Sequence, residues 1–212
     1  MTKSRPLIIL GVVLLLLFAV FTWAVQNIAV APIGPEGSEV GFSGINAAVR
    51  DKIGSNLTWY EITDLLGYGV LLIAAGFMVF ALMQVLHRRT LRIDGDLIAL
   101  AIFYVVVGIT YIFFEQYIVN YRPIILEEGL EASYPSSHTL LSLCIMGSAL
   151  MQFDMRLIRG RVPATVLCSL VMVVIVVGRL LSGVHWFTDI AASVLLSAGL
   201  LSLYGAALRK FV

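Results

Sequence analysis

The stretch GRLLSGVHWFTD, residues 178–189, places an arginine, a histidine and an aspartate between two long apolar segments. Ionisable groups beside a bilayer are costly, so their presence needs a reason. His185 and Asp189 are four residues apart, and Arg179 lies six residues upstream of His185. A helix that begins near His185 would put His185 and Asp189 on one face, where the carboxylate can orient the imidazole.

The chain around this stretch is strongly apolar. Of its 212 residues, 60% are hydrophobic and 13% are charged, and the mean hydropathy is +0.98, which excludes an ordinary soluble globular domain. A membrane-spanning helix needs about 20 mostly apolar residues. Six segments qualify: residues 7–25, 65–86, 97–114, 135–153, 162–178 and 185–208. The sequence predicts an all-α, polytopic membrane protein with six transmembrane helices, a single domain over residues 1–212 and no nucleic-acid partner.

The basic residues are unequally divided between the predicted loops. With six spans and a cytoplasmic N-terminus, the outer face keeps only Arg50, Lys52, Arg122 and Arg179. The inner face carries Lys3, Arg5, Arg88, Arg89, Arg92, Arg156, Arg159, Arg161, Arg209 and Lys210. Because cytoplasmic loops are enriched in Lys and Arg, we expect both termini to lie in the cytoplasm.

The first apolar segment is expected to be an uncleaved helix. Its apolar core is longer than that of a secretory signal, and Pro32 directly follows the candidate cleavage site at residues 29–31, which disfavours cleavage. Cys144 and Cys168 fall in different predicted spans at different depths. We therefore expect two buried thiols rather than a disulfide or a metal site.

The longest polar connection is predicted over residues 26–64. Within it, Phe42, Ile45 and Val49 recur at helical spacing, which predicts a short amphipathic helix from residue 43 to about residue 53 on the outer surface. This helix could partly cover a site, or it could be a connector that rests on the lipid headgroups.

The third span leads into EQYIVNYRP, residues 115–123. It is expected to end at about Tyr121 or Arg122, because the residue before a proline disfavours helix. The acidic loop that follows is expected to be a solvated surface rather than a gating or cation-binding site. Its carboxylates belong to Glu127, Glu128 and Glu131.

The segment PSSH, residues 135–138, is a strong helix start. Ser136 or Ser137 can cap the free backbone N–H groups of the next span. Those N–H groups and the positive end of the helix dipole form a natural anion site.

Under this topology three polar clusters meet at the outer membrane face. Arg122 and Arg179 supply planar, bidentate donors suited to phosphate. His185, backed by Asp189, is a candidate nucleophile or base, and His138 is a candidate general acid. Such a set suits phosphoryl transfer, where catalysis is mostly positioning and charge stabilisation. No cluster with metal-ligand spacing is visible, so we expect neither a metal nor another cofactor.

The three clusters resemble the signature of the type 2 phosphatidic acid phosphatase (PAP2) family, which is Lys-x6-Arg-Pro, Pro-Ser-Gly-His and Ser-Arg-x5-His-x3-Asp. Here the blocks read EQYIVNYRP, PSSH and GRLLSGVHWFTD. The six-span layout and, weakly, the segment NAAVRDKIGSNLTWYEIT are similar to bacterial members of the phosphatidylglycerolphosphate and undecaprenyl pyrophosphate phosphatase type.

This resemblance implies a role for each matched position. His185 would attack phosphorus to give a phosphohistidine, Asp189 would orient His185, and His138 would protonate the leaving oxygen and then help to activate water. The phosphoryl oxygens would be held by side-chain or backbone donors of Arg122, Arg179, Ser136 and Ser137.

Three positions depart from the family pattern. The lysine of the first block is Glu115, the glycine of the second is Ser137 and the serine of the third is Gly178. Glu115 would repel phosphate, but it lies two helical turns before Arg122 and could pair with it, while Lys52 supplied the missing cation. Alternatively, Glu115 selects a substrate with a positive or hydroxyl-rich group, or it impairs catalysis.

We therefore expect a metal-independent lipid phosphatase in a bacterial plasma membrane, with its site facing outward. It would hydrolyse a phosphate monoester or pyrophosphate of a phospholipid or polyprenyl phosphate. Undecaprenyl pyrophosphate, phosphatidylglycerol phosphate and phosphatidate are the candidate substrates. The alternatives are a lipid phosphotransferase that uses the same histidine, and a non-enzymatic lipid-binding or transport protein on the same scaffold.

Overall fold

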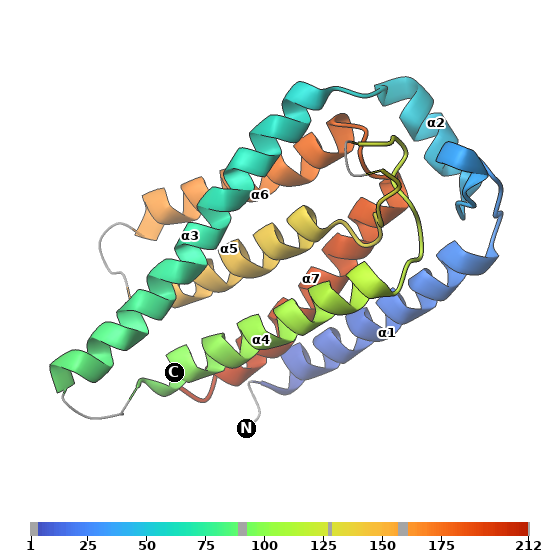
Figure 1. Cartoon of the computed structure of the whole chain (residues 1–212). Coiled ribbons are helices and arrows are strands. Elements are labelled where there is room, and N and C mark those ends of the chain that lie inside the picture. Colours follow the sequence, from blue (N-terminus) through green and yellow to red (C-terminus); the bar gives the residue numbers. More distant parts are fainter. Residues whose placement is uncertain (1–3, 89–92, 127–128, 157–160, 212) are drawn as a thin grey trace.

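The computed structural model describes residues 4–88, 93–126, 129–156 and 161–211, and over these residues the chain is helical. Six long helices run the length of a bundle (Figure 1). In chain order the elements are α1 (Arg5–Asn27), the 3-10 turn η1 (Pro35–Gly37), α2 (Ser43–Ile53), α3 (Leu57–Arg88), α4 (Gly95–Gln116), α5 (Ser137–Arg156), α6 (Arg161–Leu181) and α7 (Phe187–Leu208). The all-α prediction is confirmed.

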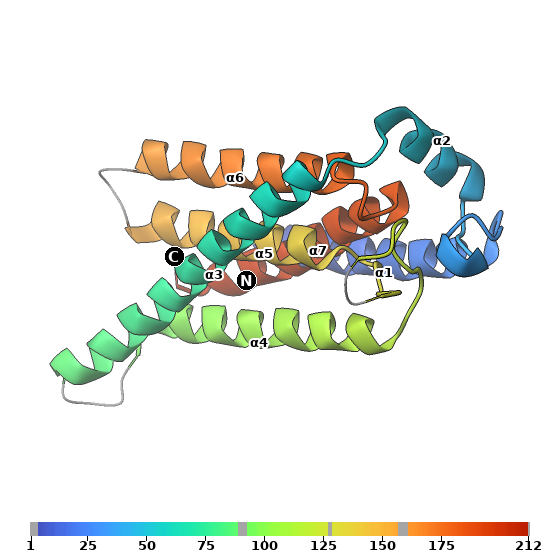
Figure 2. The ribbon, with the colours of Figure 1, turned by 45° about the horizontal axis from the view of Figure 1, so that its top comes forward.

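Helices α5 and α7 form the centre of the bundle. Helix α7 packs against α1 and α5, and α5 also packs against α3 and α6, while α3 runs obliquely across α5 (Figure 2). Helix α1 comes close to α7 at Gly199, because a Cβ atom there would lie 2.9 Å from Leu15 Cδ2 and 3.3 Å from the Leu15 backbone nitrogen. Small residues allow such close helix packing in a membrane, where burial of apolar surface between helices gives little driving force.

Five of the described helices are long and apolar enough to cross a membrane, namely α1, α3, α4, α6 and α7. Their outer faces expose large apolar side chains such as Leu72, which is 72% exposed. Helix α5 does not meet the same hydropathy criterion, because it carries buried polar side chains including Thr139, Ser148 and Gln152. Since α3, α6 and α7 pack around α5, these groups do not need to face lipid. The described chain thus has six long helices, of which five meet the criterion for a membrane span. The predicted count of six spans stays a prediction.

Both termini lie at one end of the bundle, and α2 lies at the other end with the loops that follow α1 and α4 (Figure 1). Among the basic residues predicted for the inner face, Lys3, Arg89, Arg92 and Arg159 lie outside the described residues. Cys144 and Cys168 are free, buried thiols, as predicted.

The start of α3 was predicted too late. The helix begins at Leu57 rather than at residue 65, so residues 57–64 are helical and do not belong to the outer loop predicted over residues 26–64. Asn56 explains the early start, because its side-chain oxygen accepts a hydrogen bond from the Thr58 N–H at 3.0 Å and so caps the helix.

Two further boundaries near the predicted site were wrong. Helix α4 ends at Gln116 rather than at Tyr121 or Arg122, because the chain beyond it pairs antiparallel with another loop segment, with Tyr121 opposite Ala132. Helix α7 begins at Phe187, so His185 stands in the preceding loop and not on the helix that carries Asp189.

Helix α2 occupies the predicted range. Its buried residue is Asn46, which bonds to Thr188 at the start of α7, whereas Ile45 is 53% exposed. The helix is thus anchored to the bundle by a polar contact. Its amphipathic character and its place on a membrane surface stay predictions.

Candidate active site

The predicted clusters lie at the end of the bundle opposite the termini (Figure 1). Arg179 is in the last turn of α6, His138 is in the first turn of α5, and His185 and Arg122 come from the loops between helices. The charges of Arg122 and Arg179 act on both histidines. The four side chains therefore form one electrostatic site, although they come from positions up to 63 residues apart, from Arg122 to His185.

His185 is held by a backbone carbonyl. Its Nδ1 lies 3.1 Å from the carbonyl oxygen of Ser133, and because a carbonyl can only accept, Nδ1 must carry the proton. The other ring nitrogen, Nε2, is buried and has no hydrogen-bond partner in the described part of the chain. This tautomer leaves the Nε2 lone pair free to attack an electrophile.

The environment of His185 also keeps the ring neutral. Burial lowers its pKa from 6.5 to about 4, with Arg122 and Arg179 adding to this shift and Asp189 opposing it. At neutral pH the imidazole is therefore uncharged, as a nucleophile must be.

Asp189 fixes the loop that carries His185. The buried carboxylate accepts hydrogen bonds from the Trp186 N–H and from Asn120 Nδ2, both at 2.9 Å. Its Oδ2 lies 3.8 Å from His185 Nδ1, which is beyond hydrogen-bond distance. The predicted orientation of His185 by Asp189 stays a prediction, and the shorter contact of the ring is the one with Ser133.

Asn120 connects these groups through a short pairing of two loop segments. Its carbonyl accepts from the Ser133 N–H at 2.9 Å, and the Arg122 N–H donates to the Glu131 carbonyl at 3.0 Å. The pairing links Asp189, Asn120, Ser133 and His185 in one chain of contacts. Sequence reasoning missed Asn120 and Ser133, although Asn120 lies inside the block that contains Arg122.

The two arginines retain donors that nothing in the described chain accepts. Arg179 is fully buried, with its guanidinium 4.9 Å from the centre of the Tyr60 ring, and its Nε and Nη1 have no hydrogen-bond partner in those residues. Nη1 of Arg122 is unsatisfied in the same way. Buried donors without acceptors are unfavourable, so this arrangement is suited to an anionic ligand that satisfies them.

Carboxylates contact both guanidinium groups. Arg122 Nε lies 2.8 Å from Glu131 Oε2, and Arg179 Nη2 lies 3.5 Å from Asp64 Oδ1. Glu131, predicted to belong to a solvated surface, keeps 25% of its side chain exposed while it pairs with Arg122. Glu127 and Glu128, for which the same prediction was made, lie outside the described residues.

The pairing considered between Glu115 and Arg122 is not formed. Because α4 ends at Gln116, the two residues are not on one helix, and Arg122 pairs with Glu131 instead. Glu115 and Lys52 are exposed, and neither forms an ion pair with another described residue. Their roles stay predictions.

Packing explains one of the other departures from the family blocks, the glycine at position 178. At Gly178 a Cβ atom would lie 2.5 Å from Thr63 Cγ2 of α3, so a serine would collide with that helix. Ser136 is buried, and its hydroxyl donates to Thr139 Oγ1 at 3.1 Å. Ser137 instead lines two cavities, one shared with His138 and the other with His185.

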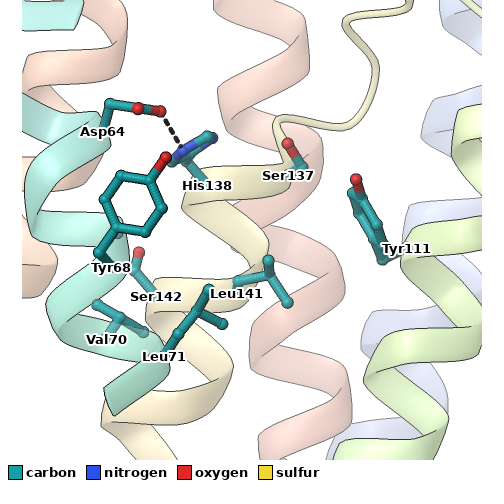
Figure 3. Close-up of a pocket in the computed structure, with 10 residues that line it drawn as sticks. Asp64, Tyr68, Val70, Leu71, Tyr111, Ser137, His138, Leu141 and Ser142 are labelled. Atoms are coloured by element: carbon teal, nitrogen blue, oxygen red, sulfur yellow. Dashed lines mark ion pairs between the residues drawn. The ribbon is translucent and has the colours of Figure 1, made fainter. Parts of the chain in front are cut away.

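The larger of these two cavities, about 250 Å³, lies between α3, α4 and α5 (Figure 3). Asp64, Ser137 and His138 make its polar end, and Val70, Leu71 and Leu141 line it on the apolar side. Asp64 Oδ1 lies 2.9 Å from His138 Nε2. Sequence reasoning missed Asp64, which it assigned to the end of a polar loop.

The smaller cavity is lined by Glu115, Ser137 and His185, among others. Glu115 therefore shares a cavity with the candidate nucleophile. Across the described residues no group of three or more His, Cys, Asp or Glu side chains could hold a metal ion, and metal independence stays a prediction.

Comparisons with known proteins identify the family of the chain and a similar fold. The sequence model of the PAP2 superfamily matches residues 65–210. The fold is similar to a crystal structure described as the first transmembrane PAP2 type phosphatidylglycerolphosphate phosphatase from Bacillus subtilis, with a TM-score of 0.66 and 16% sequence identity. The similarity covers 95% of this chain and 94% of that one. No curated protein sequence matches the chain.

Proposed function

This chain belongs to the PAP2 superfamily, and we propose that it is an integral-membrane lipid phosphatase that works through a phosphohistidine at His185. The observation that carries the proposal is the group of buried, unpartnered polar atoms. Within the described residues, Arg122 Nη1, Arg179 Nε and Nη1, and His185 Nε2 have no hydrogen-bond partner. Guanidinium donors beside a free imidazole nitrogen fit a phosphoryl group about to be attacked.

The reaction would proceed in two steps. In the first, His185 Nε2 attacks phosphorus and the bond from phosphorus to the lipid oxygen breaks, while His138 gives a proton to that oxygen. In the second, water attacks the phosphohistidine, His138 takes the water proton, and the phosphorus–nitrogen bond breaks to restore His185. Arg122, Arg179 and the backbone around Ser137 would stabilise the charge on the phosphoryl oxygens.

The shape of the larger cavity supports a lipid substrate. Its polar end carries Ser137 and His138, and its apolar side is formed by Val70, Leu71 and Leu141. Ser137 lines both this cavity and the one that contains His185, so a phosphate bound beside Ser137 would place the first carbons of a lipid tail beside the apolar side chains, between α3 and α4. Phosphatidate, phosphatidylglycerol phosphate and undecaprenyl pyrophosphate all have this division into a charged head and an apolar tail.

In the proposed orientation α5 crosses the membrane together with the five apolar helices, which gives six spans. Both termini lie in the cytoplasm, and the site lies at the outer face of a bacterial plasma membrane. Arg5, Arg209 and Lys210 lie near the termini, at the end opposite the site (Figure 1). A cysteine placed at Lys52 should react with a membrane-impermeant thiol reagent in intact cells, and a cysteine at Lys210 should not. The reverse pattern would contradict the orientation.

Phosphate release tests the function directly. Purified protein in detergent should release phosphate from at least one of the three candidate lipids, and His185→Ala should lower kcat by roughly 10³-fold or more. His87→Ala is the matched control, because His87 is exposed on α3 and bonds only to the Met83 carbonyl in the described chain. Folded wild-type protein that releases no phosphate would refute the proposal. Added alcohols that capture the phosphate would indicate a phosphotransferase.

A further inference from the structure

Asp64 holds His138 from a neighbouring helix. Its Oδ1 lies 2.9 Å from His138 Nε2 and 3.5 Å from Arg179 Nη2, so one carboxylate oxygen bridges an imidazole and a guanidinium. Figure 3 shows the contact between Asp64 on α3 and His138 on α5 at the polar end of the cavity. The Asp64 side chain is 34% exposed, and that of Arg179 is completely buried. Asp64 also lies just before residue 65, where the match to the family begins.

The position of the His138 ring fixes the role of each nitrogen. A carboxylate oxygen can accept but not donate, so the 2.9 Å contact of His138 Nε2 with Asp64 Oδ1 is attractive only when Nε2 carries a proton. Gly67 of α3 lies against the same ring edge, because a Cβ atom there would be 3.0 Å from His138 Cδ2 and 3.4 Å from Nε2. The Cδ2–Nε2 edge therefore packs against α3, and the Nδ1–Cε1 edge points away from α3.

Apart from Asp64, the groups around His138 disfavour a second proton on its ring, which would make it an imidazolium. Arg179, His185 and Arg122 all act electrostatically on His138, and the two arginines bring positive charge close to the ring. A general acid must nevertheless carry that second proton before it can donate it. Among the residues that the structure describes, the carboxylate in ion-pair contact with the His138 ring is Asp64.

We propose that Asp64 is a positioning residue that stabilises His138 as an imidazolium and directs its Nδ1–H toward the leaving oxygen. This inference rests on the proposed phosphatase function. In the first step the bond from phosphorus to the lipid oxygen breaks, and the Nδ1 proton of His138 moves to that oxygen. The proton on Nε2 stays beside the Asp64 carboxylate, so His138 ends the step neutral and ready to accept the proton of water.

The test uses two leaving groups that differ in their need for a proton. A lipid alkoxide needs protonation as it leaves, whereas the p-nitrophenolate of p-nitrophenyl phosphate does not. Asp64→Asn should slow leaving-group release in the first turnover by roughly 10²-fold for the lipid substrate, and by less than about threefold for p-nitrophenyl phosphate. The retained rate with the aryl ester also shows that the variant is folded.

Glu61→Gln is the matched control, since Glu61 is an exposed carboxylate of the same helix, and it should leave both rates unchanged. Asp64→Glu should restore part of the lipid rate. Equal slowing of both substrates by Asp64→Asn, or no slowing of either, would overturn the inference while leaving the phosphatase function intact. A faster variant would overturn it too, because it would mean that Asp64 blocks the phosphate site. A folded wild type without activity would overturn both proposals.

Discussion

The two histidines of the site are held in opposite ways. His185 is buried, and a neutral backbone carbonyl, that of Ser133, fixes its proton on Nδ1. His138 is 29% exposed along its side chain and is held by a carboxylate, that of Asp64. A carbonyl partner in a buried pocket favours the neutral imidazole of a nucleophile. A carboxylate partner is the contact that would stabilise an imidazolium at His138 against the nearby charges of Arg122 and Arg179. The difference in partner supports the two proposed roles, which the spacing of the residues alone does not distinguish.

The largest effect is expected from Asp189→Asn. The carboxylate accepts from both the Trp186 N–H and Asn120 Nδ2, and an amide would turn a donor toward one of them. We expect kcat to fall by roughly 10³-fold and the free energy of unfolding to fall by about 1–3 kcal/mol. Kinetics and thermal unfolding in detergent would measure both, with exposed Asp51→Asn on α2 as the control. Unchanged kcat would show that Asp189 does not govern His185.

Acid should destabilise the protein through His185. Burial lowers the pKa of His185 from 6.5 to about 4 in the folded state, so the folded protein binds fewer protons than the unfolded chain between these values. Stability is then fully present above pH 6.5 and is lost as the pH falls toward 4. Over this pH range the free energy of unfolding of the wild type should fall by about 3 kcal/mol more than that of His185→Ala. Chemical unfolding at each pH would measure the difference. His87→Ala should behave like the wild type, and equal acid sensitivity in all three proteins would contradict the neutral state of His185.

Glu115→Lys should have the smallest effect. Glu115 is exposed in the cavity that it shares with His185, so solvent screens its repulsion of phosphate. Replacing it with lysine should raise kcat/KM for phosphatidate by about fivefold, whereas exposed Glu39→Gln should change nothing. Loss of activity toward every lipid would instead make Glu115 part of the catalytic machinery.

Sequence patterns predicted most of the bundle, because long apolar runs leave few alternatives to membrane helices. They also predicted the range of α2, whereas the roles of the residues in the three blocks stay predictions. The boundaries at Leu57 and Gln116 were missed, since each depends on a local contact that apolar periodicity does not report. The Asn56 cap sets the start of α3 at Leu57. The end of α4 at Gln116 is followed by the antiparallel pairing of Tyr121 with Ala132.

The partners of the two histidines could not be predicted. Ser133 acts through its backbone carbonyl, which carries no sequence information, and it contacts a residue 52 positions away. Asp64 and His138 come from different helices, and their meeting depends on how α3 crosses α5. An aspartate inside a long apolar helix is itself a costly feature, and it would have been a useful sign once the true start of α3 was known.

The most direct test of the account is the site of phosphorylation on the imidazole ring. His138→Ala, treated with p-nitrophenyl phosphate, should accumulate a phosphoenzyme, because the first step needs no acid and the second lacks its base. Phosphorus NMR and peptide mass spectrometry should find the phosphoryl group on Nε2 of His185, since Ser133 holds the proton on Nδ1. A phosphoryl group on Nδ1, or on any other residue, would contradict the central claim.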